Sequence, residues 1–74
     1  GLSALTEREM EVLRFIGHGL STSAIAEQLS RSIKTIETHR ANIQRKLGLD
    51  SATQLLRYAI HWTERGDTAD QGIP

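Results

Sequence analysis

Apolar residues recur every three or four positions along most of the chain, the spacing that places them on one face of an α-helix. Thr6 followed by Glu9 matches a capping box, so we expect a first helix from here to about residue 17. Its inward residues are Met10, Leu13 and Ile16. Runs of alternating apolar and polar residues are too short to predict a strand. The pattern therefore predicts an all-α fold.

Three further helices follow, each marked by residues that start or stop helices. A short helix begins after Ser21 or Thr22. A third, capped by Ser32, runs from about Ile33 to Leu47 and is ended by Gly48, which is expected as a left-handed cap. A fourth starts at Ser51 and ends near residues 62 and 63. The inward residues of the second and fourth helices are Ile25, Ala26 and Leu29, and Ala52, Leu55, Leu56, Ala59 and Ile60. We expect a four-helix bundle.

The expected third helix has a core side and a separate polar side. The core side carries Ile36, Arg40, Ile43 and Leu47, with Ile33 and His39 on its flanks. The polar side carries Lys34, Glu37, Thr38, Ala41, Asn42 and Arg45. We expect Arg40 to lay its aliphatic stem across apolar surface. One helix can therefore stabilise the core and present a polar surface at the same time.

The ends of the chain differ from this pattern. Residues 64–74 are polar and aperiodic, so we expect a disordered tail after a single domain at residues 1–63. Position 1 is Gly rather than Met, which favours a domain cut from a longer protein whose N-terminal regulatory domain lies outside this sequence. Cysteine, a membrane-length apolar run and a signal peptide are all absent from the sequence. We expect a cytoplasmic protein without a membrane partner.

Charge is unevenly distributed along the chain. The formal net charge is zero, which by itself argues against a nucleic-acid partner. Residues 31–47, however, carry five basic residues and one acidic residue, Glu37. This local excess is typical either of a solvated helix or of a surface for an anionic partner.

The order of the second and third helices bears on this choice. A turn of three or four residues separates them, which is the form of a helix-turn-helix. In that motif the later helix enters the major groove of DNA, and about 15 residues span about 22 Å, enough to cross it. The hydroxyls at the two helix starts, including Thr22 and Ser32, suit phosphate binding.

Other chemistry finds little support in the sequence. His18, His39 and His61 fall in different helices or turns with no carboxylate at metal spacing, so we expect no metal site. The chain has no cysteine, no glycine-rich phosphate loop and no shielded set of Ser, His and Asp. We expect no enzyme activity, no cofactor and no small-molecule site.

Four stretches of the sequence form a specific set of motifs: "LTEREMEVL" at 5–13, "GLS" at 19–21, "IA" at 25–26 and "SIKTIETHRANIQRKLG" at 32–48. Together they resemble the LuxR/FixJ/NarL-type DNA-binding domain of bacterial transcription regulators. The resemblance covers about residues 4 to 62. It implies a four-helix fold, transcription regulation through double-stranded DNA, and a dimer formed by the last helix. Thr22 and Ser23 depart from an Asn-Lys pair frequent in the family, which puts one phosphate contact in doubt.

The resemblance also implies roles for particular residues. The base-reading set is Lys34, Glu37, Thr38 and Ala41. The set expected to contact the DNA backbone is Thr22, Ser32, Thr35, His39, Arg45, Lys46 and Ser51. The solvent side of the fourth helix, a candidate interface for a weak homodimer, carries Thr53, Gln54, Arg57, Tyr58 and His61. For His39, packing against the core is an equally good interpretation.

Two alternatives remain open at this point. The "LTEREMEVL" opening and a helix-turn-helix also occur in the promoter-reading fourth region of sigma factors, which would not need the patterned fourth helix. A protein-interaction module could use the same fold without DNA, and the neutral net charge and Glu37 favour it.

Overall fold

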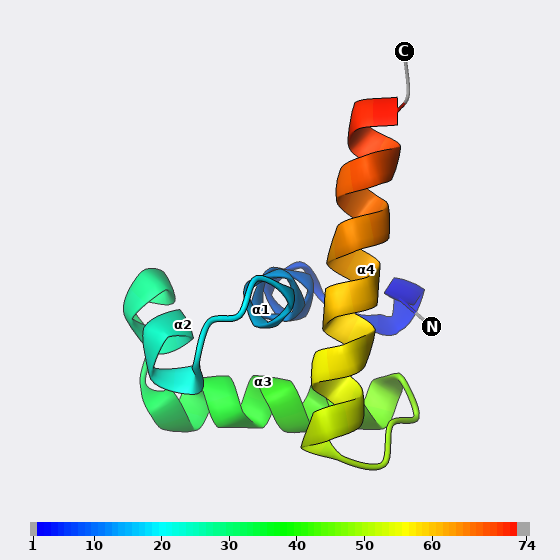
Figure 1. Cartoon of the computed structure of the whole chain (residues 1–74). Helices are drawn as coiled ribbons and strands as arrows, with labels where there is room; N and C mark the ends of the chain where they lie inside the picture. Colours follow the sequence, from blue (N-terminus) through cyan, green and yellow to red (C-terminus); the bar gives the residue numbers. More distant parts are fainter. Residues whose placement is uncertain (1, 73–74) are drawn as a thin grey trace.

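The structure is a computed structural model that describes the backbone of residues 2–72 and the side chains of residues 2–65. A short 3-10 helix, η1 (Leu2–Ala4), precedes four α-helices (Figure 1). These are α1 (Glu7–Gly17), α2 (Thr22–Leu29), α3 (Ile33–Lys46) and α4 (Ala52–Gly72). Because residues 2–72 contain helices and no strand, the predicted all-α fold is confirmed.

The starts of the first three α-helices are fixed by hydroxyl side chains. Thr6 Oγ1 accepts a hydrogen bond from the Glu9 N–H at 3.1 Å, and Glu9 Oε1 accepts one from the Thr6 N–H at 2.9 Å. The predicted capping box is therefore confirmed. Ser21 and Ser32 cap α2 and α3 in the same way, each accepting from the backbone N–H three residues later.

Left-handed residues end or follow the first three helices. Gly19 and Gly48 have φ angles of 90° and 68°, a region that glycine enters without steric cost, and the predicted cap at Gly48 is confirmed. Ser30, at the end of α2, adopts φ 53° although it is not glycine. The left-handed residue turns the chain sharply, so that only three residues separate the end of α2 from the start of α3.

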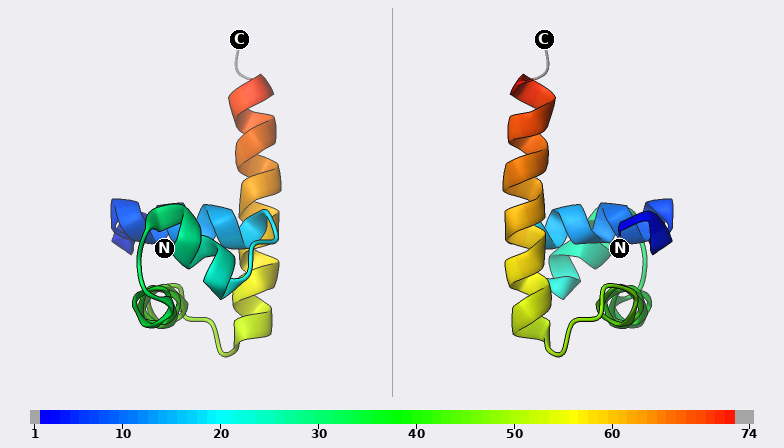
Figure 2. Two further views of the ribbon diagram at one scale, coloured as in Figure 1. Left: turned by 90° about the vertical axis from the view of Figure 1, so that its left-hand side faces the viewer. Right: turned by 90° about the vertical axis from the view of Figure 1, so that its right-hand side faces the viewer.

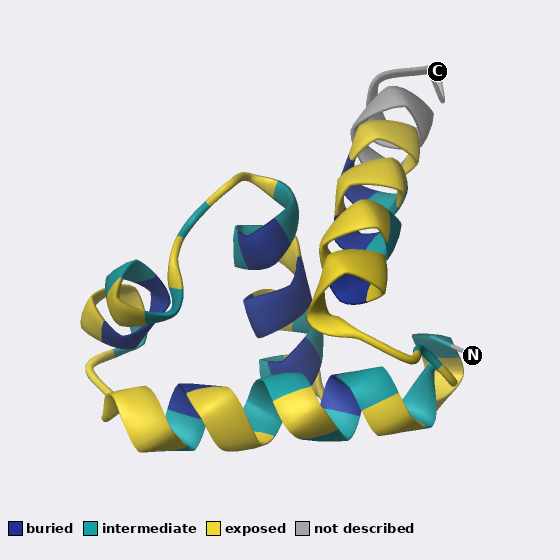
Figure 3. Ribbon diagram, turned by 60° about the horizontal axis from the view of Figure 1, so that its bottom comes forward, coloured by how far each residue is buried: buried dark blue, intermediate teal, exposed yellow. Residues whose placement is uncertain are grey.

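Helix α1 lies at the centre of the molecule and contacts all three other α-helices (Figures 1 and 2). Helices α2 and α3 pack on each other, and α4 crosses α1 on another side. The buried apolar side chains of the core are Leu5, Val12, Leu13, Ile16, Ile25, Ala26, Ile36, Ile43, Leu55 and Ala59. Figure 3 marks the buried positions in dark blue along the helices. Met10, predicted inward, is only partly buried.

Helices α1 and α4 approach closely at Gly17. A Cβ atom at this position would lie 2.5 Å from the carbonyl oxygen of Ala59 and 2.5 Å from Cγ2 of Thr63. No side chain fits in such a gap without a shift of the backbone. Glycine at the end of α1 therefore allows α4 to lie directly against it.

The predicted inward side of α4 was wrong in part. Leu55 and Ala59 are buried, but Ala52, Leu56 and Ile60 are exposed, the last two at 43% and 38%. The physical reason is that α4 packs extensively on α1 alone, so only a narrow stripe of α4 can be covered.

The predicted end of this helix also needs correction, since the helical backbone continues past residue 63 to Gly72. Glu64 and Arg65 are good helix formers, and a single glycine lowers helix stability without ending a helix. The predicted disorder of the tail at 64–74 stays a prediction, because the side chains beyond residue 65 lie outside the described residues.

Candidate nucleic-acid interface

Helices α2 and α3 form the predicted helix-turn-helix, joined by Ser30, Arg31 and Ser32. Ile36 and Ile43 anchor α3 in the core with no exposed surface. The opposite side of α3 runs along the edge of the molecule, free of other helices (Figures 1 and 3). The helix has 14 residues, which corresponds to a length of about 21 Å. It therefore offers an uncovered helical side of the length that a DNA groove accepts.

The structure brings the predicted base-reading residues together on this uncovered side. Lys34, Glu37, Thr38 and Ala41 are all exposed, and their spacing of three, four and seven residues places them in one row. Neither Lys34 nor Glu37 takes part in an ion pair with any other described residue. Their charged groups are consequently available to a partner.

Most of the predicted backbone-contacting residues lie at helix starts. Thr22 opens α2, Ser32 caps α3 and Ser51 precedes α4. The Ser32 and Thr35 hydroxyl oxygens are 2.9 Å apart, and Ser51 Oγ accepts from the Gln54 N–H at 3.2 Å. The exposed N–H groups of a first helical turn, with such hydroxyls beside them, suit the binding of phosphate oxygens.

Arg45 is exposed at the far end of the same helix. Its guanidinium donates to Asn42 Oδ1 at 3.2 Å, one turn back along α3. This local bond holds the guanidinium along the outer side of the helix without neutralising its charge.

Lys46 differs from Arg45 in its surroundings. Its Nζ lies 2.8 Å from Glu9 Oε1, and its side chain is 23% exposed. The pair joins the last turn of α3 to the first turn of α1. Sequence reasoning placed Lys46 on the DNA backbone and missed this partner, because Glu9 is 37 residues away in the chain.

Glu9 is a buried carboxylate with several favourable partners. Burial alone would raise the pKa of Glu9, but its hydrogen bonds from Lys46 and Thr6 and the nearby charges of Lys46 and His39 outweigh burial and lower it. His39 is half-buried, and its Nδ1 is buried with no hydrogen-bond partner among the described residues. One edge of this imidazole therefore faces the protein interior, in keeping with the packing interpretation.

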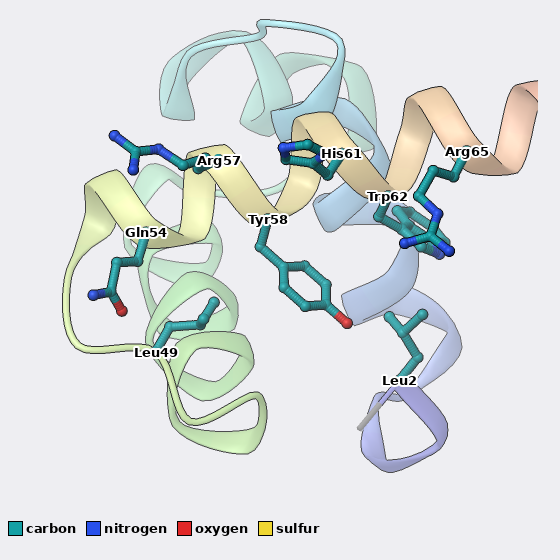
Figure 4. A pocket seen from close by; sticks show the side chains of 8 residues that line it. All are labelled: Leu2, Leu49, Gln54, Arg57, Tyr58, His61, Trp62 and Arg65. Carbon is teal, nitrogen blue, oxygen red and sulfur yellow. The ribbon is translucent and has the colours of Figure 1, made fainter.

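The predicted dimer residues on α4 occupy two different surfaces. Thr53 lies beside the exposed Leu56 and Ile60, next to the first turn of α2. The others border a groove of about 640 Å³ against Leu2, Leu49 and Trp62 (Figure 4). They are Gln54, Arg57, Tyr58 and His61. Sequence reasoning assigned Leu56 and Ile60 to the core. The apolar stripe of α4 is wider than one neighbouring helix can cover, and this width was the available signal that the two residues face outward.

Among the described side chains, no group of three His, Asp or Glu residues lies close enough together to hold a metal ion. No helix in the described part of the chain is long and apolar enough to cross a membrane.

The chain is similar to a family of known proteins. The family described as bacterial regulatory proteins, luxR family, matches residues 3–59. Fimbriae Z protein of Salmonella typhimurium is 53% identical over 55 residues, covering 74% of this chain and 26% of that protein. Oxygen regulatory protein NreC of Staphylococcus aureus is 45% identical over 56 residues, covering 76% and 26%. The chain thus spans about a quarter of the length of these relatives.

The family match includes α1, α2, α3 and the first part of α4, so it covers the whole helix-turn-helix. It confirms the resemblance inferred from the motifs. Because the family consists of regulatory proteins, the expectation that the chain is not an enzyme is also confirmed. The chain belongs to the luxR family of bacterial regulatory proteins.

Proposed function

We propose that this domain binds double-stranded DNA in a sequence-specific manner, as the output domain of a bacterial transcription regulator of the response-regulator class. One observation carries the proposal: the uncovered side of α3 exposes Lys34, Glu37 and Thr38 in one row, with both charges free of ion pairs within the described chain. A helix that reads bases needs such unpartnered polar groups, since each must meet a base edge.

Each base-reading residue has a chemical role in this proposal. Lys34 donates to O6 or N7 of guanine, and Glu37 accepts from N4 of cytosine. The methyl groups of Thr38 and Ala41 contact the methyl group of thymine. Because a carboxylate beside phosphates is unfavourable without a base donor, Glu37 contributes to selectivity rather than to affinity.

The DNA backbone is held by a second set of residues. Thr22, Ser32, Thr35, Arg45 and Ser51 have hydroxyl or guanidinium groups at helix starts or on the outer side of α3. Such contacts fix the orientation of the protein on the duplex but do not read sequence. The resemblance also placed His39 and Lys46 in this set, but His39 Nδ1 is buried and Lys46 pairs with Glu9.

Two copies of the domain bind paired half-sites in this proposal. We assign the weak dimer contact to one stripe of α4, made of Thr53, Leu56 and Ile60. The exposed side chains of Leu56 and Ile60 supply the apolar component that the predicted polar set lacked. Dimerisation would place two copies of α3 on half-sites about one helical turn apart.

The rest of the regulator lies beyond this domain. Each relative is matched over only 26% of its length, which supports an accompanying N-terminal regulatory domain. A DNA-binding output domain is expected in the cytoplasm. The family assignment removes the support for a sigma-factor domain and leaves the protein-interaction module as the alternative.

Mapping of backbone amide signals by NMR during addition of a short duplex tests the proposal. The largest shifts are expected in the outer residues of α3 and in the first turns of α2 and α4. A protein-interaction module would show no saturable change with DNA. Shifts confined to the groove at Tyr58 and Trp62 would place the contact elsewhere and contradict the proposal.

A further inference from the structure

The ion pair between Glu9 and Lys46 links the helix-turn-helix to the first helix. Glu9 is 4% exposed, and its Oε1 accepts both the Lys46 ammonium at 2.8 Å and the Thr6 backbone N–H at 2.9 Å. This hydrogen bond joins two α-helices whose paired residues lie 37 positions apart in the sequence. A single carboxylate oxygen of Glu9 therefore links the start of α1 to the end of α3.

The position of the pair along α3 matters as much as its strength. Ile36 and Ile43 are fully buried and hold α3 against the core from its first turn to Ile43. Beyond Ile43, Leu47 is only partly buried, so apolar packing restrains the last turn less. The ammonium of Lys46 supplies a directed contact at this point, because its distance and angle to the carboxylate are more restricted than an apolar contact.

A purely stabilising role does not account well for this arrangement. Removing a carboxylate and an amine from water is costly, and a buried ion pair is often no more stabilising than apolar residues of similar size. What such a pair does supply is one preferred geometry, since the same buried carboxylate oxygen is also held by the Thr6 N–H. The geometry fixed here is that of the helix whose outer side carries Lys34 and Glu37.

We infer that Glu9 is a positioning residue for DNA binding, which acts through Lys46 to set the orientation of the last turn of α3. The inference rests on the proposed DNA-binding function and goes beyond it in two ways. It gives a role to a residue of α1 that lies away from the proposed DNA contacts. It also assigns Lys46 to the interior pair rather than to a phosphate.

Two substitutions separate these roles while preserving shape. Glu9→Gln removes the negative charge but keeps an oxygen for the capping box, which accepts Gln at this position. Lys46→Met removes the ammonium but keeps an unbranched apolar stem. Glu11→Gln is the matched control, because Glu11 is exposed on the same helix and pairs locally with Arg8 at 3.3 Å.

The experiment measures binding of a duplex selected by the wild-type domain at several salt concentrations, at a temperature where every variant is folded. Glu9→Gln and Lys46→Met are each expected to weaken binding by about five- to tenfold, as coupled residues do. The slope of log K against log salt is expected to stay unchanged, since no phosphate contact is lost. The double variant is expected to bind no more weakly than the weaker single variant.

Hydrogen exchange of the DNA-free domain provides a second readout. The amides of the last turn of α3 are expected to exchange faster in Glu9→Gln, while those around Ile36 keep the wild-type rate. Glu11→Gln is expected to match the wild type in binding and in exchange. These results together would place Glu9 in control of the end of α3.

Three results would overturn the inference. A salt slope lowered by about one in Lys46→Met, with unchanged affinity in Glu9→Gln, would make Lys46 a phosphate contact. A lower melting temperature with unchanged affinity would leave Glu9 merely structural. If the wild-type domain bound no duplex, the proposed function would fail, and the exchange result would still decide whether Glu9 orients α3.

Discussion

Lys34 and Arg45 lie on the same outer side of α3 but in different chemical situations. Lys34 has no partner among the described residues, whereas the guanidinium of Arg45 donates to Asn42 Oδ1 at 3.2 Å. In the proposed complex Arg45 contacts the DNA backbone. A residue that meets a base edge affects one position of the binding site, whereas a phosphate contact affects all sequences alike. The two residues therefore test the division between reading and positioning.

Lys34→Ala is expected to relax the base preference at one position, at a cost of about 1 to 3 kcal/mol for the preferred duplex. Arg45→Ala is expected to weaken binding to all duplexes similarly and to lower the salt slope by about one. Titration of the preferred duplex and its single-base variants measures both effects. Arg8→Ala on α1 serves as the control. Equal losses on every duplex for Lys34→Ala would contradict its role as a base reader.

The lowered pKa of Glu9 predicts how stability depends on pH. Because this pKa is lower in the folded than in the unfolded chain, the unfolded chain binds more protons and stability rises with pH in that range. The contribution is complete above the ordinary value of 4.5 and is lost as pH falls through the folded-state pKa. The pair with Lys46 is therefore expected to weaken in acid.

Glu9→Gln is expected to lower the free energy of unfolding by about 1 to 3 kcal/mol at pH 7. The difference from the wild type should shrink as pH falls below 4.5, since the wild-type carboxyl is then protonated too. Urea unfolding of both proteins between pH 7 and pH 3 measures this difference in the free energy of unfolding. A difference that stays constant over the whole range would show that the charge of Glu9 does not stabilise the fold.

The elements differ in how far the sequence predicted them. The starts of α1, α2 and α3 could be read from Thr6, Ser21 and Ser32, because capping depends on residues close in sequence. The inward side of α4 could not be read from the sequence, since it depends on how many helices cover α4. The left-handed turn at Ser30 was missed because glycine usually occupies such a position.

Ser30→Gly is expected to stabilise the domain by about 0.5 to 1 kcal/mol, because glycine adopts a positive φ angle without steric cost. Ser30→Ala is the control and should give no such gain, since alanine retains the clash of its Cβ atom. Thermal unfolding of the three proteins measures the difference. A Ser30→Gly domain less stable than the wild type would show that the φ angle of 53° carries no strain.

Neighbouring leucines on α4 separate core packing from the proposed dimer stripe. Leu55→Ala is expected to cost about 2 to 5 kcal/mol of stability, because Leu55 is fully buried. The exposed pair Leu56→Ser and Ile60→Ser should leave stability within about 0.5 kcal/mol. It should remove cooperative binding to a duplex with two half-sites, as measured by titration against a single half-site. Retained cooperativity would place the dimer contact outside this stripe.

For the whole molecule, the placement of charge is more informative than its sum. A net charge of zero conceals an outer side of α3 that carries Lys34 and Arg45, whereas Glu9 in the acidic first turn of α1 is paired with Lys46. The row of proposed base-reading residues on α3 could be predicted from the sequence, because all of them lie on one helix with a period of 3.6 residues. The ion pair between Glu9 and Lys46 could not be predicted, because only the folded chain brings α1 and α3 together.

The most direct test of the central claim is a selection of randomised duplex DNA by this domain, followed by titration of the selected duplex at two salt concentrations. We predict an enriched motif with two-fold symmetry, half-sites about one helical turn apart, and affinity that falls as salt rises. A selection without enrichment, together with binding that does not depend on salt, would contradict DNA recognition by α3.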